Sequence, residues 1–132
     1  MTTLSVDLWM LVAATMWTLA LTAPLLVGRV KTPGGHPWAL GNREEPFAFA
    51  PWLGRANRAH RNMVENLAPF AVLVLVCHVT GKANDLTALG SQIFVGARVA
   101  HALCYIAGLV PWRTLAFIVG FGAELVIFFQ LL

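Results

Sequence analysis

The sequence predicts an all-α membrane protein in which a single domain, residues 1–132, forms a bundle of four transmembrane helices. Hydrophobic residues make up 58% of the chain and charged residues only 11%, and the mean hydropathy is +0.72. A soluble globule carries about 25% charged residues, and a chain this small could not bury so much apolar surface in water. Helices satisfy their own backbone hydrogen bonds in lipid, so the expected class is all-α.

Four apolar stretches are each close to the ~20 residues that a helix needs to cross ~30 Å of hydrocarbon. They cover residues 8–27, 54–79, 86–110 and 114–132. The first stretch contains no charge, and no Lys or Arg precedes it as in a signal peptide, so we expect it to remain as a span. In the second, Pro69 cannot donate to the carbonyl of Glu65, and we expect a kink there.

Connections are expected where glycine and proline gather. Residues 28–52 include Pro33-Gly34-Gly35 and three further prolines, and are predicted to form a long irregular loop. Lys and Arg concentrate in and beside this loop and at Arg113 in the third connection, whereas the second connection has only Lys82 and the termini have none. The positive-inside rule therefore places loops one and three in the cytoplasm and both termini on the opposite side. The short loops and the missing signal peptide favour a bacterial inner membrane over a microsomal one.

Two of the predicted spans carry polar residues on one helical face. In the second span the spacing is i, i+3, i+4 and i+7, at Arg58, Arg61, Asn62 and Glu65. In the third span the spacing is i, i+3 and i+7, at Arg98, His101 and Tyr105. A charge in hydrocarbon costs at least ~2.5 kcal/mol on insertion scales. Glu65 and Arg98 both lie ~18 Å along their helices from the cytoplasmic side, so we predict a structural ion pair between them.

These polar faces allow two interpretations. The structural interpretation is one buried ion pair beside an Arg-rich helix end whose side chains extend to anionic headgroups. That interpretation leaves Asn62, His101 and Tyr105 unexplained. The functional interpretation is a pocket that opens to the cytoplasm and binds an anionic, hydrogen-bonding ligand. Glu124 in the fourth span has no partner that the sequence identifies.

A family resemblance enters at these same residues. The run Arg58-Ala59-His60-Arg61-Asn62-Met63-Val64-Glu65-Asn66, followed by Pro69-Phe70, resembles the second-helix signature of the MAPEG family, membrane-associated proteins in eicosanoid and glutathione metabolism. The third-helix motif of the family is similar to Arg98-Val99-Ala100-His101 with Tyr105. Arg113, just before the fourth span, resembles the arginine assigned to thiol activation in the glutathione-using members. Helix count, loop placement and motif order extend this likeness over nearly the whole chain.

The resemblance implies a homotrimer with glutathione sites between neighbouring subunits, in the cytoplasmic half of the membrane. It implies six glutathione-binding residues, namely Arg58, Arg61, Asn62, Glu65, His101 and Tyr105. Three further residues are candidate glutathione contacts: Arg29, His60 and Thr114. Arg113 would be catalytic, because a guanidinium held against the sulfur favours the reactive thiolate. The implied partners are glutathione as co-substrate, membrane lipid, and an apolar electrophile that arrives from the lipid.

The implied activity is that of a glutathione transferase, extending to a glutathione peroxidase, on lipophilic substrates. The sequence departs from the family at one position, which argues against predicting a specific eicosanoid reaction. Phe117 stands where several glutathione-using members have a tyrosine one turn after the catalytic arginine. The alternative is a non-catalytic member that binds lipid or a partner protein. A third class, the small four-helix drug/proton exchanger, is disfavoured because it places a carboxylate in its first span, and residues 8–27 contain none.

Other partners are not expected from the composition. The four histidines show no pairing typical of a metal site, so no metal is predicted. Cys77 and Cys104 lie in apolar runs and are expected to be free packing residues. The net charge of +3 is small and sits on a membrane scaffold, which argues against a nucleic-acid partner.

Overall fold

The computed structural model describes residues 3–132 and contains six helices and no strand over that range. The helices are α1 (Val6–Ala20), α2 (Thr22–Lys31), α3 (Gly35–Leu40), α4 (Pro51–Val79), α5 (Asp85–Ala107) and α6 (Val110–Phe129). Four segments are long and apolar enough to cross a membrane: α1 with α2, α4, α5 and α6. The predicted all-α class with four spans is therefore confirmed.

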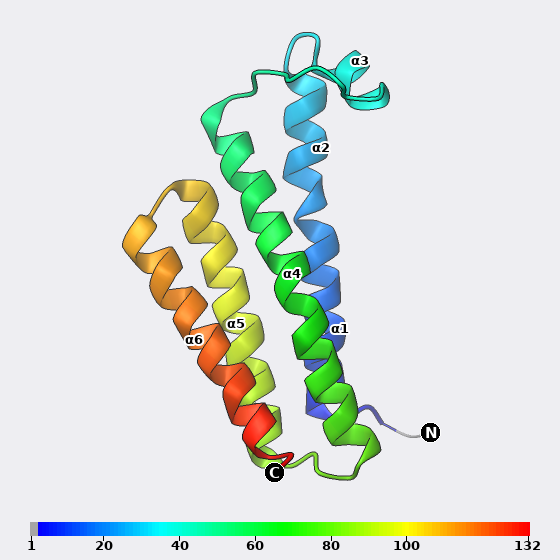
Figure 1. The fold of residues 1–132 in the computed structure, drawn as a ribbon, viewed down its shortest axis with the longest axis vertical. Coiled ribbons are helices and arrows are strands. Elements are labelled where there is room, and N and C mark those ends of the chain that lie inside the picture. Colours follow the sequence, from blue (N-terminus) through cyan, green and yellow to red (C-terminus); the bar gives the residue numbers. More distant parts are fainter. Residues whose placement is uncertain (1–2) are drawn as a thin grey trace.

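The four spans lie side by side in one bundle (Figure 1). The start of α1 and the end of α6 lie at one end of the bundle, together with the turn between α4 and α5. The α2–α4 connection with α3 and the α5–α6 turn lie toward the other end. Helix α5 packs against α1, α4 and α6. Polar residues on its different faces can therefore contact both α4 and α6.

The first span is longer than predicted and is interrupted. It runs over Val6–Lys31 instead of residues 8–27, with a turn at Leu21 between α1 and α2. Pro24 explains the interruption, because it has no N–H to donate to the carbonyl of Ala20. The second span begins at Pro51, three residues before the predicted start, and a proline suits this first helical position because its missing N–H would be unpaired there.

The prediction of an irregular loop over residues 28–52 is wrong in part. Helix α2 continues to Lys31, and the short helix α3 follows Gly34, whose φ of +76° suits a glycine. Aromatic packing holds α3 against the rest of the connection: the Trp38 ring lies 5.2 Å from that of Phe49 and 5.8 Å from that of Phe47. These partners are nine and eleven residues away, so local composition did not reveal the helix.

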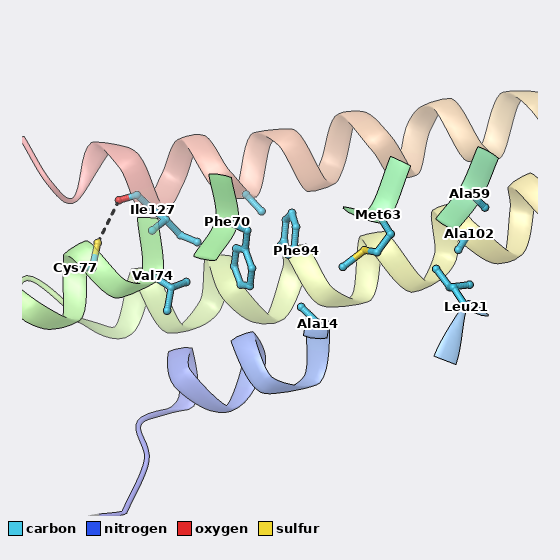
Figure 2. Packing of buried hydrophobic residues seen from close by; sticks show 11 residues of the cluster. Ala14, Leu21, Ala59, Met63, Phe70, Val74, Cys77, Phe94, Ala102 and Ile127 are labelled. Atoms are coloured by element: carbon cyan, nitrogen blue, oxygen red, sulfur yellow. Dashed lines mark hydrogen bonds between the residues drawn. The ribbon is translucent and has the colours of Figure 1, made fainter. Parts of the chain in front are cut away.

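The core lies between α4, α5, α6 and α1. Phe70 of α4 stacks on Phe94 of α5 with ring centroids 3.9 Å apart, and both are fully buried (Figure 2). Toward the termini, the Cys77 thiol donates a weak hydrogen bond of 3.9 Å to the carbonyl of Ile127 on α6. Gly90 lets α5 and α6 approach closely, because a Cβ there would lie 2.9 Å from Cγ1 of Ile127.

Candidate functional site

Three helices meet around Tyr105 near the connection end of the bundle. The Arg113 guanidinium from α6 lies 4.4 Å from the centre of the Tyr105 ring, and the Arg58 guanidinium from α4 lies 5.9 Å from it. Both distances are within the range of a cation–π interaction. Tyr105 therefore supports two cations that come from separate helices.

His101 connects this cluster to the backbone of α6. Its ring lies edge-on to Tyr105, with centroids 5.5 Å apart, and its Nδ1 lies 2.9 Å from the carbonyl oxygen of Arg113. A carbonyl oxygen only accepts, so Nδ1 carries the hydrogen. Nε2 is buried and makes no hydrogen bond within residues 3–132. The contact fixes the first turn of α6, and with it Arg113, against α5.

Arg98 lies deeper in the bundle and is only 1% exposed. Its guanidinium lies 5.1 Å from the centre of the Phe94 ring and 5.0 Å from that of the Phe117 ring. Its Nη1 donates to Oδ1 of Asn62 over 3.3 Å. On α6 the guanidinium lies against Gly120, and the buried Glu124 lies one turn after that glycine. The side chain of Arg98 thus links α5 to both α4 and α6.

The predicted ion pair between Glu65 and Arg98 is wrong. Glu65 pairs instead with Arg61 one turn earlier on α4, with Oε1 3.1 Å from Nε, and this is the one salt bridge found over residues 3–132. The prediction placed Glu65 and Arg98 at the same depth in the membrane, but depth does not determine the direction in which each side chain extends from its helix axis. Arg98 is directed into the bundle, whereas Glu65 is on the outer surface of α4. Gly120 provides the room on α6, because a Cβ there would lie 3.1 Å from Nε of Arg98.

The Arg61–Glu65 pair is exposed in the middle of a span. The two side chains are 79% and 59% exposed. Glu65 is fourteen residues from either end of α4, which is about 21 Å along the helix. Such a charge is too costly to leave against hydrocarbon. This face of α4 therefore requires protein or water next to it.

A cavity of about 560 Å³ lies between the end of α2, the start of α4 and the long connection. Three arginines line it, Arg29, Arg55 and Arg58, and no acidic residue does. Aromatic side chains form much of the remaining wall, at Trp38, Phe47 and Phe49. Arg58 also lies over Tyr105, so it joins this cavity to the Tyr105 cluster.

The sequence-predicted residues thus form separate groups. Four converge directly, Arg58, His101, Tyr105 and Arg113, and Asn62 joins Arg98 deeper in the bundle. Arg61 and Glu65 are on the outer face of α4, and Arg29 borders the cavity. The Thr114 hydroxyl is engaged by its own helix, donating 3.1 Å to the carbonyl of Val110. For His60, no hydrogen bond is found within the described range.

Sequence reasoning missed several residues that shape the site. Arg55 donates 2.8 Å from Nε to the carbonyl of Ile106 and so ties the start of α4 to the end of α5. Phe117, Gly120 and Glu124 together form the surface of α6 that receives Arg98. Their spacing of three and four residues places them on one helical face, and this was the available signal.

The sequence model of the MAPEG family matches residues 8–132. The chain belongs to the MAPEG family. The resemblance seen in the second and third spans is therefore confirmed. With its four apolar helices, this MAPEG protein is an integral, multi-pass membrane protein.

Curated relatives of this MAPEG protein carry the name microsomal glutathione S-transferase 1. The protein of Rattus norvegicus is 39% identical over 79 residues, that of Homo sapiens 38% and that of Bos taurus 37%. The aligned region is 59% of this chain and 51% of each relative. The chain thus spans about half the length of the curated relatives it matches.

A metal centre finds no support in the donor residues. Between residues 3 and 132, no three or more His, Cys, Asp or Glu side chains gather in a way that could hold a metal ion. Cys77 and Cys104 are both free thiols.

Proposed function

We propose that this MAPEG protein is a membrane-bound glutathione transferase that joins the thiolate of glutathione to lipophilic electrophiles. The observation that carries the proposal is the Tyr105 cluster, where Arg58 and Arg113 lie over one ring and His101 holds the start of α6. The names of the relatives and the family support it.

Glutathione carries two carboxylates and one ammonium at neutral pH, and the chain offers matching groups. In this proposal, Arg58, Arg61 and Asn62 bind carboxylates, for which guanidinium groups provide paired donors. Glu65 accepts from the ammonium, and His101 and Tyr105 complete the site from α5. Three more residues are proposed as peripheral contacts: Arg29, His60 and Thr114.

Arg113 is the proposed catalytic residue. A thiol with an ordinary pKa of ~8.5 is mostly protonated at neutral pH, and a guanidinium beside the sulfur favours the thiolate. The thiolate then attacks the electrophilic carbon, the carbon–sulfur bond forms, and the leaving group departs with the electron pair. The thiol proton goes to water. The proposal extends to peroxidase activity: the same thiolate attacks a lipophilic hydroperoxide and releases the alcohol, and a second glutathione reduces the resulting sulfenic acid to give glutathione disulfide and water.

The exposed Arg61–Glu65 pair supports a subunit interface on α4. A neighbouring subunit would shield these charges from lipid and place a second surface against the proposed glutathione groups. The proposed assembly is a homotrimer. The proposed setting is a bacterial inner membrane, with the α2–α4 and α5–α6 connections in the cytoplasm.

A conjugation assay with an aryl halide tests the activity. Arg113→Ala should lower the rate at pH 7 by about tenfold or more, because a thiol with an ordinary pKa of ~8.5 is then only a few per cent thiolate. Lys31→Ala removes one cation from the exposed end of α2 and is the matched control, with an unchanged rate expected. Equal rates for wild type and Arg113→Ala would remove Arg113 from the catalytic role.

The second candidate is a non-catalytic MAPEG protein that binds lipid or a partner protein. It is favoured by one observation: Phe117, next to His101 at 6.0 Å between ring centres, supplies no hydroxyl to a reacting thiol. Thermal unfolding separates the two candidates. Glutathione at 100 times its Kd should add ~2.7 kcal/mol to the stability of a glutathione-binding protein. No shift at millimolar glutathione would favour the non-catalytic candidate.

A further inference from the structure

Arg98 is buried in a site formed by residues of three helices, α4, α5 and α6. It is 1% exposed, and its guanidinium fits onto α6 where Gly120 has no side chain. The rings of Phe94 and Phe117 are both in contact with it. Nη1 is the donor atom that bonds Asn62, while Nε and Nη2 make no hydrogen bond within residues 3–132. The Arg98 side chain is thus held by packing and by charge, and Nη1 is its one hydrogen-bond donor to α4 within the described residues.

Glu124 supplies the countercharge for this arrangement. It is 7% exposed and lies one turn after Gly120, on the face of α6 where a Cβ at Gly120 would lie 3.1 Å from Nε and Nη2 of Arg98; no salt bridge shorter than 4 Å joins the two charges within residues 3–132. A buried cation without a compensating charge is strongly unfavourable. Asp7, the other buried acidic residue within residues 3–132, accepts from Thr87 at the opposite end of α5. Glu124 is therefore the buried acidic group whose place on α6 balances the charge of Arg98.

This arrangement fixes the orientation of the Asn62 carboxamide. A carboxamide can rotate by half a turn and exchange its oxygen for its nitrogen. The hydrogen bond from Arg98 is compatible with only one of these orientations, because Oδ1 of Asn62 must face Nη1 of Arg98. The NH2 group then occupies the other branch of the carboxamide. It makes no hydrogen bond within the described chain and is free to donate to a ligand.

We propose that Glu124 and Gly120 are positioning residues for the glutathione site. They hold Arg98 against α6, and Arg98 fixes the Asn62 carboxamide with its NH2 group available to a glutathione carboxylate. The inference rests on the proposed function. It assigns the positioning of Asn62 to two residues of α6 that do not themselves touch glutathione.

The first experiment measures how the two residues affect glutathione binding. Glu124→Gln and Gly120→Ala should each raise KM and Kd for glutathione about fivefold, the value of one misaligned hydrogen bond of ~1 kcal/mol. We expect kcat to stay within about twofold and KM for the aryl halide to stay unchanged. Gly122→Ala is the matched control, because a Cβ there meets nothing within 4 Å. A fall in melting temperature with unchanged glutathione KM in both variants would overturn the proposal.

A double-mutant cycle tests whether Glu124 acts through Asn62. In the Asn62→Ala background, Glu124→Gln should have no further effect on glutathione Kd, because the carboxamide that it positions is gone. Additive losses would show that Glu124 acts by another route and would overturn the proposal.

A readout without glutathione separates this inference from the proposed function. The chain has five asparagines, Asn42, Asn57, Asn62, Asn66 and Asn84, so selective 15N-asparagine labelling gives few side-chain NMR signals. The Asn62 NH2 signal, assigned by its loss in Asn62→Ala, should shift in Glu124→Gln and Gly120→Ala but not in Gly122→Ala. An unmoved signal would overturn the positioning role. A shifted signal in a protein that does not bind glutathione would leave the positioning of Asn62 standing and would reject the proposed ligand.

Discussion

Tyr105 contributes a flat surface as well as a hydroxyl, and the two contributions can be separated. Tyr105→Phe keeps the ring beneath Arg58 and Arg113, whereas Tyr105→Leu removes it. Each cation–π contact is worth about 0.5–1 kcal/mol. We expect Tyr105→Leu to raise glutathione KM about tenfold and Tyr105→Phe to change it about threefold or less. Steady-state kinetics at varied glutathione measures both, and equal effects would assign the role to the hydroxyl.

The sequence was informative about which side chains matter and less so about which of them meet. The spacing of Arg98, His101 and Tyr105 placed them on one face of α5, and His101 and Tyr105 are indeed neighbours. The partner of Glu65 was wrong because a residue count gives depth along a helix and not the direction of a side chain. The slot for Arg98 depends on the missing Cβ of Gly120 on a different helix, which no local pattern reveals.

Glycine sets the distance between α5 and α6, and a pair of substitutions on α5 tests this. In Gly90→Ala the new Cβ would lie 2.9 Å from Ile127 and 3.2 Å from the carbonyl oxygen of Ala123, so α6 must shift. Overpacking of this kind costs about 1–3 kcal/mol. Gly96→Ala on the same helix meets nothing within 4 Å and is the control. Unfolding of the detergent-solubilised protein should show a loss for the first variant and none for the second.

The Phe70–Phe94 stack joins α4 to α5, and its removal should weaken the bundle. Phe70→Ala leaves a cavity at a fully buried position and should cost about 3 kcal/mol. Phe121→Ala removes the same side chain from a position that is 51% exposed on α6, and we expect a change within about 0.5 kcal/mol. Equal losses in unfolding free energy would contradict the assigned core.

Helices and turns were predictable where a local cause exists. Apolar runs gave the four spans, and the proline at the start of α4 and the glycine that ends α5 at Gly108 mark their limits. Helix α3 was missed because its stability depends on contacts of Trp38 with residues in the following segment. The extension of the first span to Lys31 was missed because Gly28, Arg29 and Lys31 have the composition of the loop that follows.

The assembled protein should contain more than one copy of the chain. Native mass spectrometry of the detergent-solubilised protein should give an oligomer, because the exposed Arg61–Glu65 pair needs a covering surface, and a trimer is the stoichiometry proposed from the family. Replacing both residues by leucine removes that need and should shift the distribution toward smaller species. A wild-type protein that remains monomeric at all concentrations would contradict the interface.

Membrane orientation is a separate prediction with its own measurement. Alkaline phosphatase fused after Leu132 should be active, because the enzyme folds outside the cytoplasm, and fusions within residues 41–50 or after Leu109 should be inactive. The physical reason is the concentration of Lys and Arg at the connection end of the bundle. The reverse pattern would place the arginine-lined cavity on the outer side.

Helix α4 carries adjacent residues with opposite surroundings: Asn62 is tied inward to Arg98, while Arg61 is directed outward with Glu65. A rotation of this helix therefore moves both at once. In the proposed trimer, where Arg61 and Glu65 bind glutathione at the subunit interface, ligand binding and self-association are linked equilibria, and each changes the other by the same factor. Dilution that separates the chains should release bound ligand, and saturating ligand should protect the oligomer against dilution by mass action.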